Sequence, residues 1–184
     1  PNIDSVCVGR TLTVATAGGS GGCGVVANQF RRYNGSWSAW AGGAAPSFAA
    51  VLGGDTIQSR RTATGPGCVT SSVNSVSWGT VPQVVGPVIS KSPNVATVCA
   101  GTMLTPNITT PGSGGLGVAQ DQYRYSTNNG GVWIGWSATV PNFAAVNTGN
   151  NLIEGRRYIN VANSGCNTAL STPNRLTWGV ATQP

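Results

Sequence analysis

Tryptophan and arginine are the residues of this sequence whose spacing could form a binding surface. The pattern Trp-x-x-Trp occurs twice, and each occurrence follows a Gln-aromatic-Arg motif and precedes an Arg-Arg pair. Indole rings stack on sugar rings, and guanidinium groups bind sulfate, carboxylate or phosphate groups. The candidate ligand-binding residues are Trp37, Trp40, Arg31 and Arg60 in the first occurrence, and Trp133, Trp136, Arg124 and Arg156 in the second.

The same residues could instead maintain the fold. Arg61 and Arg157 follow Ile57 and Ile153 by four residues, so in a strand each arginine shares a face with an apolar side chain. A long arginine stem can pack inward while its charged end reaches water. Because the whole set recurs, we favour a structural role. The alternative is a pair of carbohydrate-binding modules with exposed Trp and Arg faces.

The composition excludes much other chemistry. The chain of 184 residues contains no His, only 4 Asp and Glu together and one lysine, Lys91, and its formal net charge is +6. Without His there is no imidazole base and no His-ligated metal, and the scattered acids form neither a paired-carboxylate site nor a calcium loop. We therefore expect no enzyme, no cofactor and no metal. The sequence has no Lys/Arg run and no apolar run near ~18 residues, so we expect no nucleic-acid partner and no membrane insertion.

An internal repeat explains why these motifs occur twice. The tetrapeptide Phe-Ala-Ala-Val at residues 48–51 recurs at residues 143–146. The repeat predicts two homologous domains and, because both copies begin and end at equivalent positions, a longer parent array. The expected domains are residues 1–83 and 88–184, with a linker at residues 84–87. Prolines bound this linker region, so we expect it to be extended and stiff.

Short alternating patterns indicate strands, and no segment has a helical stripe. Asn34-Gly35 and Asn129-Gly130-Gly131 are hairpin-turn signals at matching places in the two copies. Seven short strands per copy predict an all-β fold class: two tandem immunoglobulin-like β-sandwich domains, each with one disulfide. The strands expected in the first copy are residues 5–8, 11–17, 28–33, 37–40, 48–51, 57–64 and 73–78.

Five cysteines in a Thr/Ser/Asn-rich chain indicate an oxidising, extracytoplasmic setting. Each copy has one cysteine near its start and another in a Gly-Cys turn. Cys23 has Leu116 as its counterpart, so we expect it to be a free thiol or to pair outside the chain. The disulfides that both copies could make are Cys7–Cys68 and Cys99–Cys166.

The second copy resembles a known family of repeats. Its residues 122–133 (QYRYSTNNGGVW), Tyr158 after Arg156-Arg157, and Ser164-Gly165-Cys166 are similar to the immunoglobulin-like units of giant Bacteroidetes cell-surface adhesins, including gliding-motility adhesins of the SprB type. Those units have an aromatic-x-aromatic strand, an Asn/Asp-Gly-Gly-x-Trp turn, a Tyr/Arg-Arg strand and a Gly-Cys turn paired to an early cysteine. The first copy departs from this pattern with Arg32 where the second copy has Tyr125.

The resemblance implies a non-catalytic segment of a large secreted adhesin at the extracellular cell surface. Such a segment would act as a spacer and as a multivalent, low-affinity attachment, with gliding motility as one setting. The expected partners are neighbouring repeats of the same chain and a polysaccharide or abiotic surface. We expect the isolated fragment to be monomeric.

Overall fold

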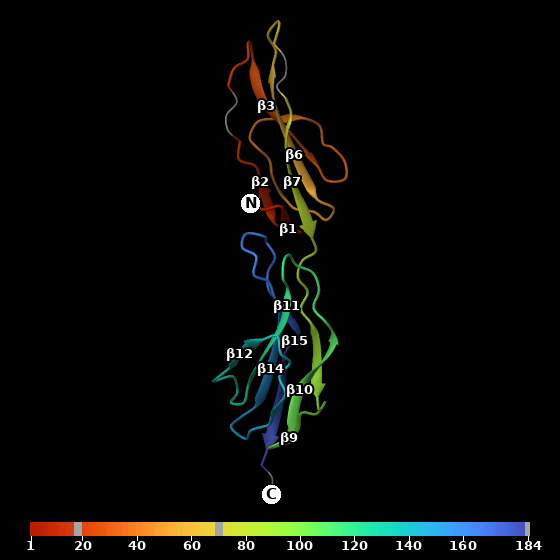
Figure 1. Ribbon diagram of the computed structural model, residues 1–184, viewed down its shortest axis with the longest axis vertical. Helices are drawn as coiled ribbons and strands as arrows, with labels where there is room; N and C mark the ends of the chain where they lie inside the picture. Colours follow the sequence, from red (N-terminus) through yellow and green to blue (C-terminus); the bar gives the residue numbers. More distant parts are fainter. Residues whose placement is uncertain (17–19, 69–71, 183–184) are drawn as a thin grey trace. The chain divides into compact units, whose positions relative to one another are not determined.

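A computed structural model describes residues 1–16, 20–68 and 72–182, and all of its regular elements are β-strands (Figure 1). The all-β prediction is therefore confirmed. Within these described ranges no helix is long and apolar enough to cross a membrane. The chain divides into two compact units by its internal contacts. The first comprises Pro1–Pro82 together with Val161–Cys166, and the second comprises Gln83–Asn160 together with Asn167–Pro184.

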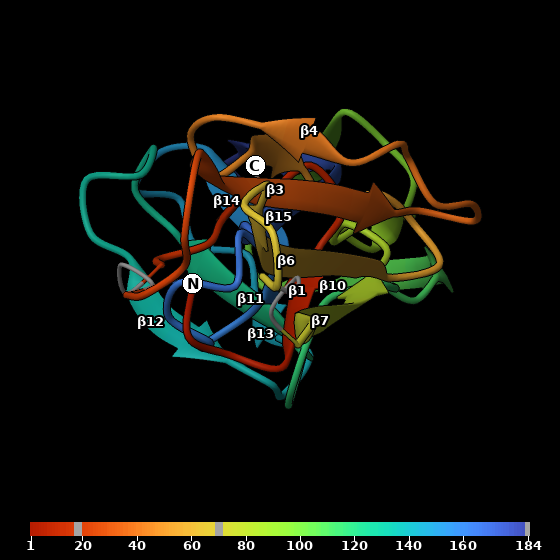
Figure 2. The same ribbon diagram turned by 90° about the horizontal axis from the view of Figure 1, so that it is seen from above.

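The first unit is built on a five-stranded sheet in the order β1-β7-β6-β3-β4, with β2 and β5 forming a separate two-stranded sheet. The long strands β3 and β6 are antiparallel and lie side by side, which Figure 2 shows from above. The strands are β1 (Ser5–Cys7), β2 (Thr11–Thr13), β3 (Val26–Tyr33), β4 (Ala41–Gly42), β5 (Ser47–Ala49), β6 (Asp55–Ala63) and β7 (Asn74–Val81).

Six of the seven strands predicted for the first copy are present, with shifted ends. The exception is the predicted strand at residues 37–40. There Trp37 forms only a single bridge with Tyr33, and the next strand begins at Ala41. Residue 17, the last of the predicted strand 11–17, lies outside the described residues. The Asn34-Gly35 turn signal is consistent with the structure, since Gly35 has a φ of 97°, which favours glycine.

The second unit has an eight-stranded sheet in the order β12-β11-β14-β15-β8-β10-β13, with β9 also pairing to β15. Its central strands β11 and β14 correspond to β3 and β6 of the first unit. The strands are β8 (Val88–Ser92), β9 (Thr97–Cys99), β10 (Met103–Thr110), β11 (Gln120–Ser126), β12 (Ile134–Ser137), β13 (Phe143–Ala144), β14 (Asn151–Tyr158) and β15 (Ala169–Ala181).

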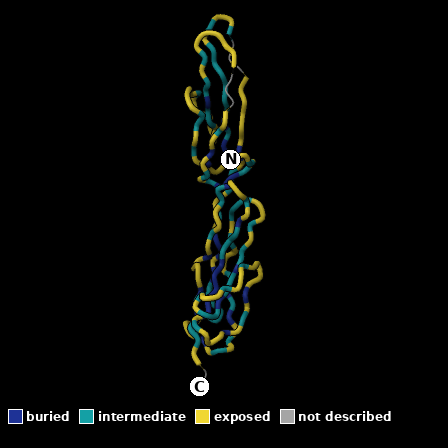
Figure 3. Tube along the Cα trace, turned by 90° about the vertical axis from the view of Figure 1, so that its left-hand side faces the viewer, coloured by how far each residue is buried: buried dark blue, intermediate teal, exposed yellow. Residues whose placement is uncertain are grey.

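Each unit has its own apolar core. Figure 3 shows buried residues, in dark blue, within both units. A tryptophan of the last strand anchors each core. The Trp78 Nε1–H donates to the carbonyl oxygen of Pro1 at 3.2 Å, and the Trp178 Nε1–H donates to that of Pro93 at 2.9 Å. The buried core residues include Val6, Leu12, Phe30 and Ile57 in the first unit, and Ile89, Leu104, Tyr123, Ile153 and Leu176 in the second.

In both units an early strand and the last strand are parallel neighbours. Val6 of β1 pairs with Thr80 of β7, and Val98 of β9 pairs with Val180 of β15. Parallel neighbours begin at the same end of a sheet and finish at the same end. Each unit is therefore entered by the chain at one end of its last strand and left at the other.

This topology also makes the expected disulfides wrong. The two disulfides are Cys7–Cys166 and Cys23–Cys68, and the free cysteine is Cys99 rather than Cys23. Cys7 pairs with Val81 at the end of the last strand, whereas Cys68 follows the far end of β6 at Ala63. The nine residues of β6 separate these ends by roughly 26 Å, and a disulfide spans at most about 7 Å between Cα atoms.

Candidate functional site

The four candidate residues of the first unit come together as one stack, which we call the first ladder: Trp37, Arg31, Trp40 and Arg60. The guanidinium carbon of Arg31 lies 4.3 Å from the ring centroid of Trp37 and 4.6 Å from that of Trp40. The guanidinium carbon of Arg60 lies 4.1 Å from the centroid of Trp40. Cations and indoles therefore alternate along this stack.

The strand register explains why the two arginines of the first ladder meet the two tryptophans. On neighbouring strands Arg31 is opposite Gln58, and Arg60 is opposite Gln29. Residues two apart along a strand share a face, so both arginines project from the same side of the sheet. The Nε–H of Arg31 donates to Gln58 Oε1 at 2.8 Å, and the Nε–H of Arg60 donates to Gln29 Oε1 at 2.9 Å. The glutamines hold the guanidinium planes in place.

The second unit repeats this arrangement in what we call the second ladder: Trp133, Arg124, Trp136, Arg156 and Tyr158. Arg124 lies 4.3 Å from the Trp133 centroid and 4.6 Å from the Trp136 centroid, and Arg156 lies 4.1 Å from the Trp136 centroid. Arg156 also lies 4.7 Å from the ring of Tyr158. The three arginine–tryptophan distances of the second ladder equal the corresponding distances of the first ladder.

The second ladder differs in how its arginines are fixed. Glu154 occupies the place of Gln58 and accepts the Nε–H of Arg124 at 2.8 Å. The same carboxylate accepts the Nε–H of Arg175 at 2.8 Å from the neighbouring strand β15. Arg156 donates to Gln122 Oε1, as Arg60 does to Gln29. One carboxylate therefore joins three strands, where the first unit has an amide.

Burial affects the protonation of two groups in the second unit. The pKa of the Arg156 guanidinium is lowered from its ordinary value, chiefly because burial disfavours the charged form. The pKa of Tyr123 is raised, first by burial and second by the negative charge of Asp121. At both groups burial therefore disfavours the charged form, which is the guanidinium cation of Arg156 and the phenolate of Tyr123.

Beside each ladder lies a further position at which the two units have different residues. In the first unit the guanidinium of Arg32 forms a salt bridge with the buried carboxylate of Asp55 and lies 3.7 Å from the ring of Phe48. In the second unit Tyr125 occupies the place of Arg32, and its ring stacks on Phe143 with centroids 4.2 Å apart. A charged contact in one unit is an aromatic contact in the other.

Asp55 and its counterpart Asn151 perform one further task in common. The Asp55 Oδ2 accepts the backbone N–H of Val51 at 2.9 Å, and the Asn151 Oδ1 accepts that of Val146 at 3.1 Å. Both side chains are buried and fix the turn that precedes their strand. The recurring requirement is an oxygen acceptor, and the charge depends on whether an arginine is nearby.

Three of the four acids are thus held by arginines. Asp55 pairs with Arg32, Asp121 pairs with Arg157 at 3.1 Å, and Glu154 pairs with Arg124 and Arg175. Among the described residues no cluster of three or more His, Cys, Asp or Glu could hold a metal ion. The arrangement is suited to cross-linking strands.

Sugar stacking would need indole faces that are open to solvent. Trp37 is 40% exposed, whereas Trp40, Trp133 and Trp136 are half-buried, and arginines lie over all four rings. The guanidinium groups occupy ring faces that a sugar would use. This geometry favours the structural role of the ladders.

Several residues of the site were missed from the sequence. Gln58 and Glu154 were not recognised as partners of the ladder arginines, nor Arg175 as a partner of Glu154. Aligning the copies could have suggested the first two, because Gln58 and Glu154 each stand two residues before the ladder arginine of an Arg-Arg pair. Nothing comparable marked Arg175, whose counterpart in the sheet register is Ser75.

No protein-family model matches the chain, and a search of curated proteins finds no relative. The interpretation of its function therefore depends on the residues and their geometry.

Proposed function

We propose that the chain is a non-catalytic repeat segment of a large secreted cell-surface adhesin. In this proposal it consists of two tandem immunoglobulin-like β-sandwich domains. They serve as a spacer and as multivalent, low-affinity attachment points to a polysaccharide or abiotic surface, with gliding motility as one setting. Neighbouring repeats of the same chain are the other expected partners.

The observation that carries the spacer role is the parallel pairing of an early strand with the last strand in each unit. A unit entered at one end and left at the opposite end can be joined to further copies without a return connection. Tension applied to the two chain ends would load the hydrogen bonds between these strands together, because they cross the direction of pull. A stalk requires both properties.

The two ladders support a structural role for the recurrent residues. Each cation–π contact at a partly exposed site contributes about 0.5–1 kcal/mol, and the Arg–Gln and Arg–Glu hydrogen bonds add to this. The contacts join strands that are far apart in sequence, such as β3 and β6. In small units of this size they are a useful supplement to the apolar core.

The disulfides support the compartment. Two disulfides indicate an oxidising, extracytoplasmic environment. The cell surface is the specific location that we propose within it. Weak sites presented on many linked copies would hold a surface firmly, because each bound copy raises the effective concentration of the next.

Adhesion as a function of copy density tests the attachment role. Beads carrying the chain at increasing density would be washed over polysaccharide-coated and bare glass surfaces. We expect retention to rise more steeply than linearly with density, while single chains wash off. Beads carrying an unrelated all-β domain of similar net charge are the control. Equal retention of the two kinds of bead at every density would contradict the proposal.

The carbohydrate-binding module is the second candidate, and the exposed part of Trp37 is the observation in its favour. A glycan array probed with the monomeric chain distinguishes the two. We expect no saturable binding. Saturable binding that is lost in Trp37→Ala and Trp133→Ala, with the fold retained by circular dichroism, would establish the binding module instead.

A further inference from the structure

Cys7 and Cys99 occupy the same place in their two units. Cys7 pairs with Val81 of the last strand of the first unit, and Cys99 pairs with Ala181 of the last strand of the second. The hydrogen bonds that follow are also shared. The N–H of Gly9 donates to the carbonyl of Ala50, and the N–H of Gly101 donates to that of Ala145. The local backbone gives no reason for one cysteine to be bonded and the other free.

Their surroundings nevertheless differ. Cys7 is 0% exposed and forms a disulfide with Cys166, whereas Cys99 is exposed and is a free cysteine. Val161–Cys166 belongs to the first compact unit, although the sequence repeat places it in the second copy. We call this segment the Gly-Cys loop. The first unit is covered at Cys7 by a loop from a different copy of the repeat.

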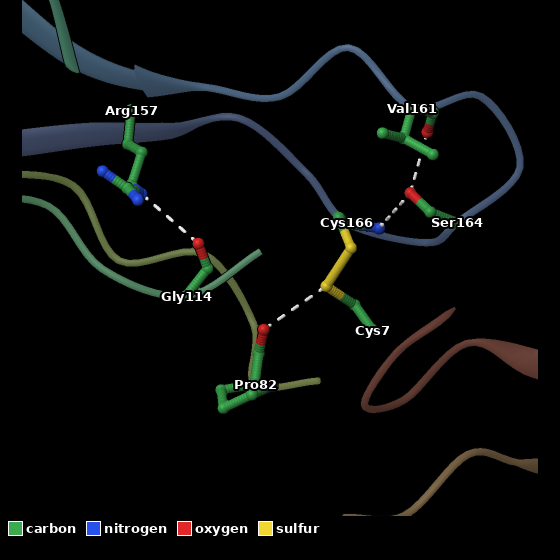
Figure 4. The surroundings of a disulfide bond; sticks show 7 residues. All are labelled: Cys7, Pro82, Gly114, Arg157, Val161, Ser164 and Cys166. Carbon is green, nitrogen blue, oxygen red and sulfur yellow. Dashed lines mark hydrogen bonds between the residues drawn. A yellow bond between two sulfur atoms is a disulfide. The ribbon is translucent and has the colours of Figure 1, made fainter. Parts of the chain in front are cut away.

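The Gly-Cys loop is well fitted to this position (Figure 4). The N–H of Cys7 donates to the carbonyl oxygen of Ser164 at 2.9 Å, so a backbone hydrogen bond accompanies the disulfide that Figure 4 shows between Cys7 and Cys166. Ser164 is fully buried, and its hydroxyl donates to the carbonyl oxygen of Val161 while accepting the N–H of Cys166. A Cβ at Gly165 would lie 2.6 Å from the Cβ of Arg10, so only glycine fits.

The first copy has a corresponding Gly-Cys turn, but its cysteine is already engaged. Cys68 forms a disulfide with Cys23, which lies close because Val26 and Ala63 are paired at that end of the sheet. The second copy has Leu116 in place of Cys23, and this leaves Cys166 without such a partner. A copy without the additional cysteine therefore offers its loop cysteine to the Cys7 position of another copy.

We propose that Cys99 is a covalent docking site for the Gly-Cys loop of a further copy of this repeat. That loop would cover Cys99 and form a disulfide with it, as Val161–Cys166 covers Cys7 and forms a disulfide with it in the first unit. The inference rests on the proposed repeat-array function, although its test has a readout independent of adhesion. Such links would run head to tail, because the early cysteine and the loop cysteine belong to opposite ends of a unit.

The chemistry is a thiol oxidation. Cys99 and the loop cysteine each give up one proton and one electron as their sulfur atoms bond. A low-molecular-weight disulfide such as oxidised glutathione accepts the two electrons and two protons and becomes two thiols. The two disulfides already present show that the chain is suited to such conditions.

The direct test extends the full chain after Gln183 with one more copy of residues 84–184, leaving both original units unchanged. The extended chain is refolded in a glutathione redox buffer, and its free thiols are counted by maleimide labelling under denaturing conditions. We expect one free thiol, which belongs to the Cys99 position of the added copy. Non-reduced tryptic peptides should show a Cys99–Cys166 link beside the Cys7–Cys166 and Cys23–Cys68 links, and loss of the Cys99–Cys166 link in the Cys99→Ser control described below assigns it to the original Cys99.

Three free thiols in a folded extended chain would overturn the proposal. The Cys99→Ser variant of the extended chain is the matched control, and we expect it to have two free thiols. A positive thiol result without bead adhesion would sustain the covalent site and reject the attachment role. Adhesion with three free thiols would do the reverse.

A second test uses a point substitution in the original chain. Cys23→Leu installs the residue of the second copy and frees Cys68, so that Cys99 of one molecule can join Cys68 of the next. We expect a series of disulfide-linked oligomers. Peptides linked Cys68–Cys99 should be about tenfold more abundant than peptides linked Cys68–Cys68, a ratio that requires only about 1.4 kcal/mol of docking free energy. A statistical mixture of disulfide pairings in the folded variant would contradict the proposal. The control variant Cys23→Leu/Cys99→Ser should form no disulfide-linked oligomer larger than a dimer.

Discussion

The two units build the same ladder around different charges, and the difference shows which features of the ladder are essential. Where the first unit has Gln58 and Ser75, the second has Glu154 and Arg175. The corresponding arginine–tryptophan distances are nevertheless equal, from 4.1 to 4.6 Å in both units. The ladder therefore requires an oxygen acceptor for its arginine, and a carboxylate appears together with an additional arginine.

The exchange beside the ladder runs in the opposite direction. Arg32 and Asp55 in the first unit become Tyr125 and Asn151 in the second. Each exchange adds or removes one cation and one anion together, so neither alters the net charge of its unit. A lone buried charge would be costly, whereas a pair or a neutral substitute is tolerated. The comparison predicts that charges in these units act as pairs.

The largest expected effect is at Asp55. Asp55→Ala leaves the Arg32 guanidinium unpaired and removes the acceptor of the Val51 N–H, so we expect the first unit to lose about 3 kcal/mol of stability. Hydrogen exchange of β6 in the full chain, with β14 as an internal reference, measures this loss. The double variant Arg32→Tyr/Asp55→Asn installs the residues of the second unit and should recover most of it. A double variant less stable than Asp55→Ala would show that the pairs are not interchangeable.

A smaller effect is expected at Glu154. Glu154→Gln installs the residue of the first unit and weakens the bonds to Arg124 and Arg175. Because Arg175 is half exposed, we expect a loss of about 1.5 kcal/mol in the second unit, measured by exchange of β14. The converse change Gln58→Glu should stabilise the first unit by less than about 0.5 kcal/mol, since Ser75 offers no second cation. If Glu154→Gln destabilised the second unit by as much as Gln58→Glu stabilised the first, the prediction that charges act as pairs would be contradicted.

The smallest effect concerns alkaline pH. Tyr123 has Phe30 as its counterpart, and the pKa of Tyr123 is raised above its ordinary value of 10.0 by burial and by Asp121. Above pH 10 the unfolded chain loses this proton first, so the stability of the second unit falls as pH rises, by less than about 1.4 kcal/mol per pH unit. Exchange of β14 and β6 at pH 10 to 11 compares the units.

In Tyr123→Phe the additional pH dependence of the second unit should disappear. An unchanged alkaline slope in this variant would assign the effect to other tyrosines.

Part of the fold and of the site could be predicted from local sequence. Alternating patterns located strands in the first copy, and the repeat located the ladder residues Trp37 and Trp133 at matching positions. The strand predicted at residues 37–40 failed because Trp37 and Trp40 point their rings at arginines from a connecting segment. A tryptophan can support a sheet from outside its hydrogen-bonded strands, and alternation alone does not distinguish this case.

The sequence by itself determined the all-β class, the duplication and the residue types of the ladders, because these follow from short-range pattern and from comparison of the copies. The tertiary structure decided which charges pair, because that depends on strand register across the sheet, as for Arg175 and Glu154. It also decided the disulfides. Repetition suggested that each copy would close on itself, but the length of β6 keeps Cys7 and Cys68 at opposite ends of the unit. A disulfide requires proximity in space, and only the folded sheet determines that.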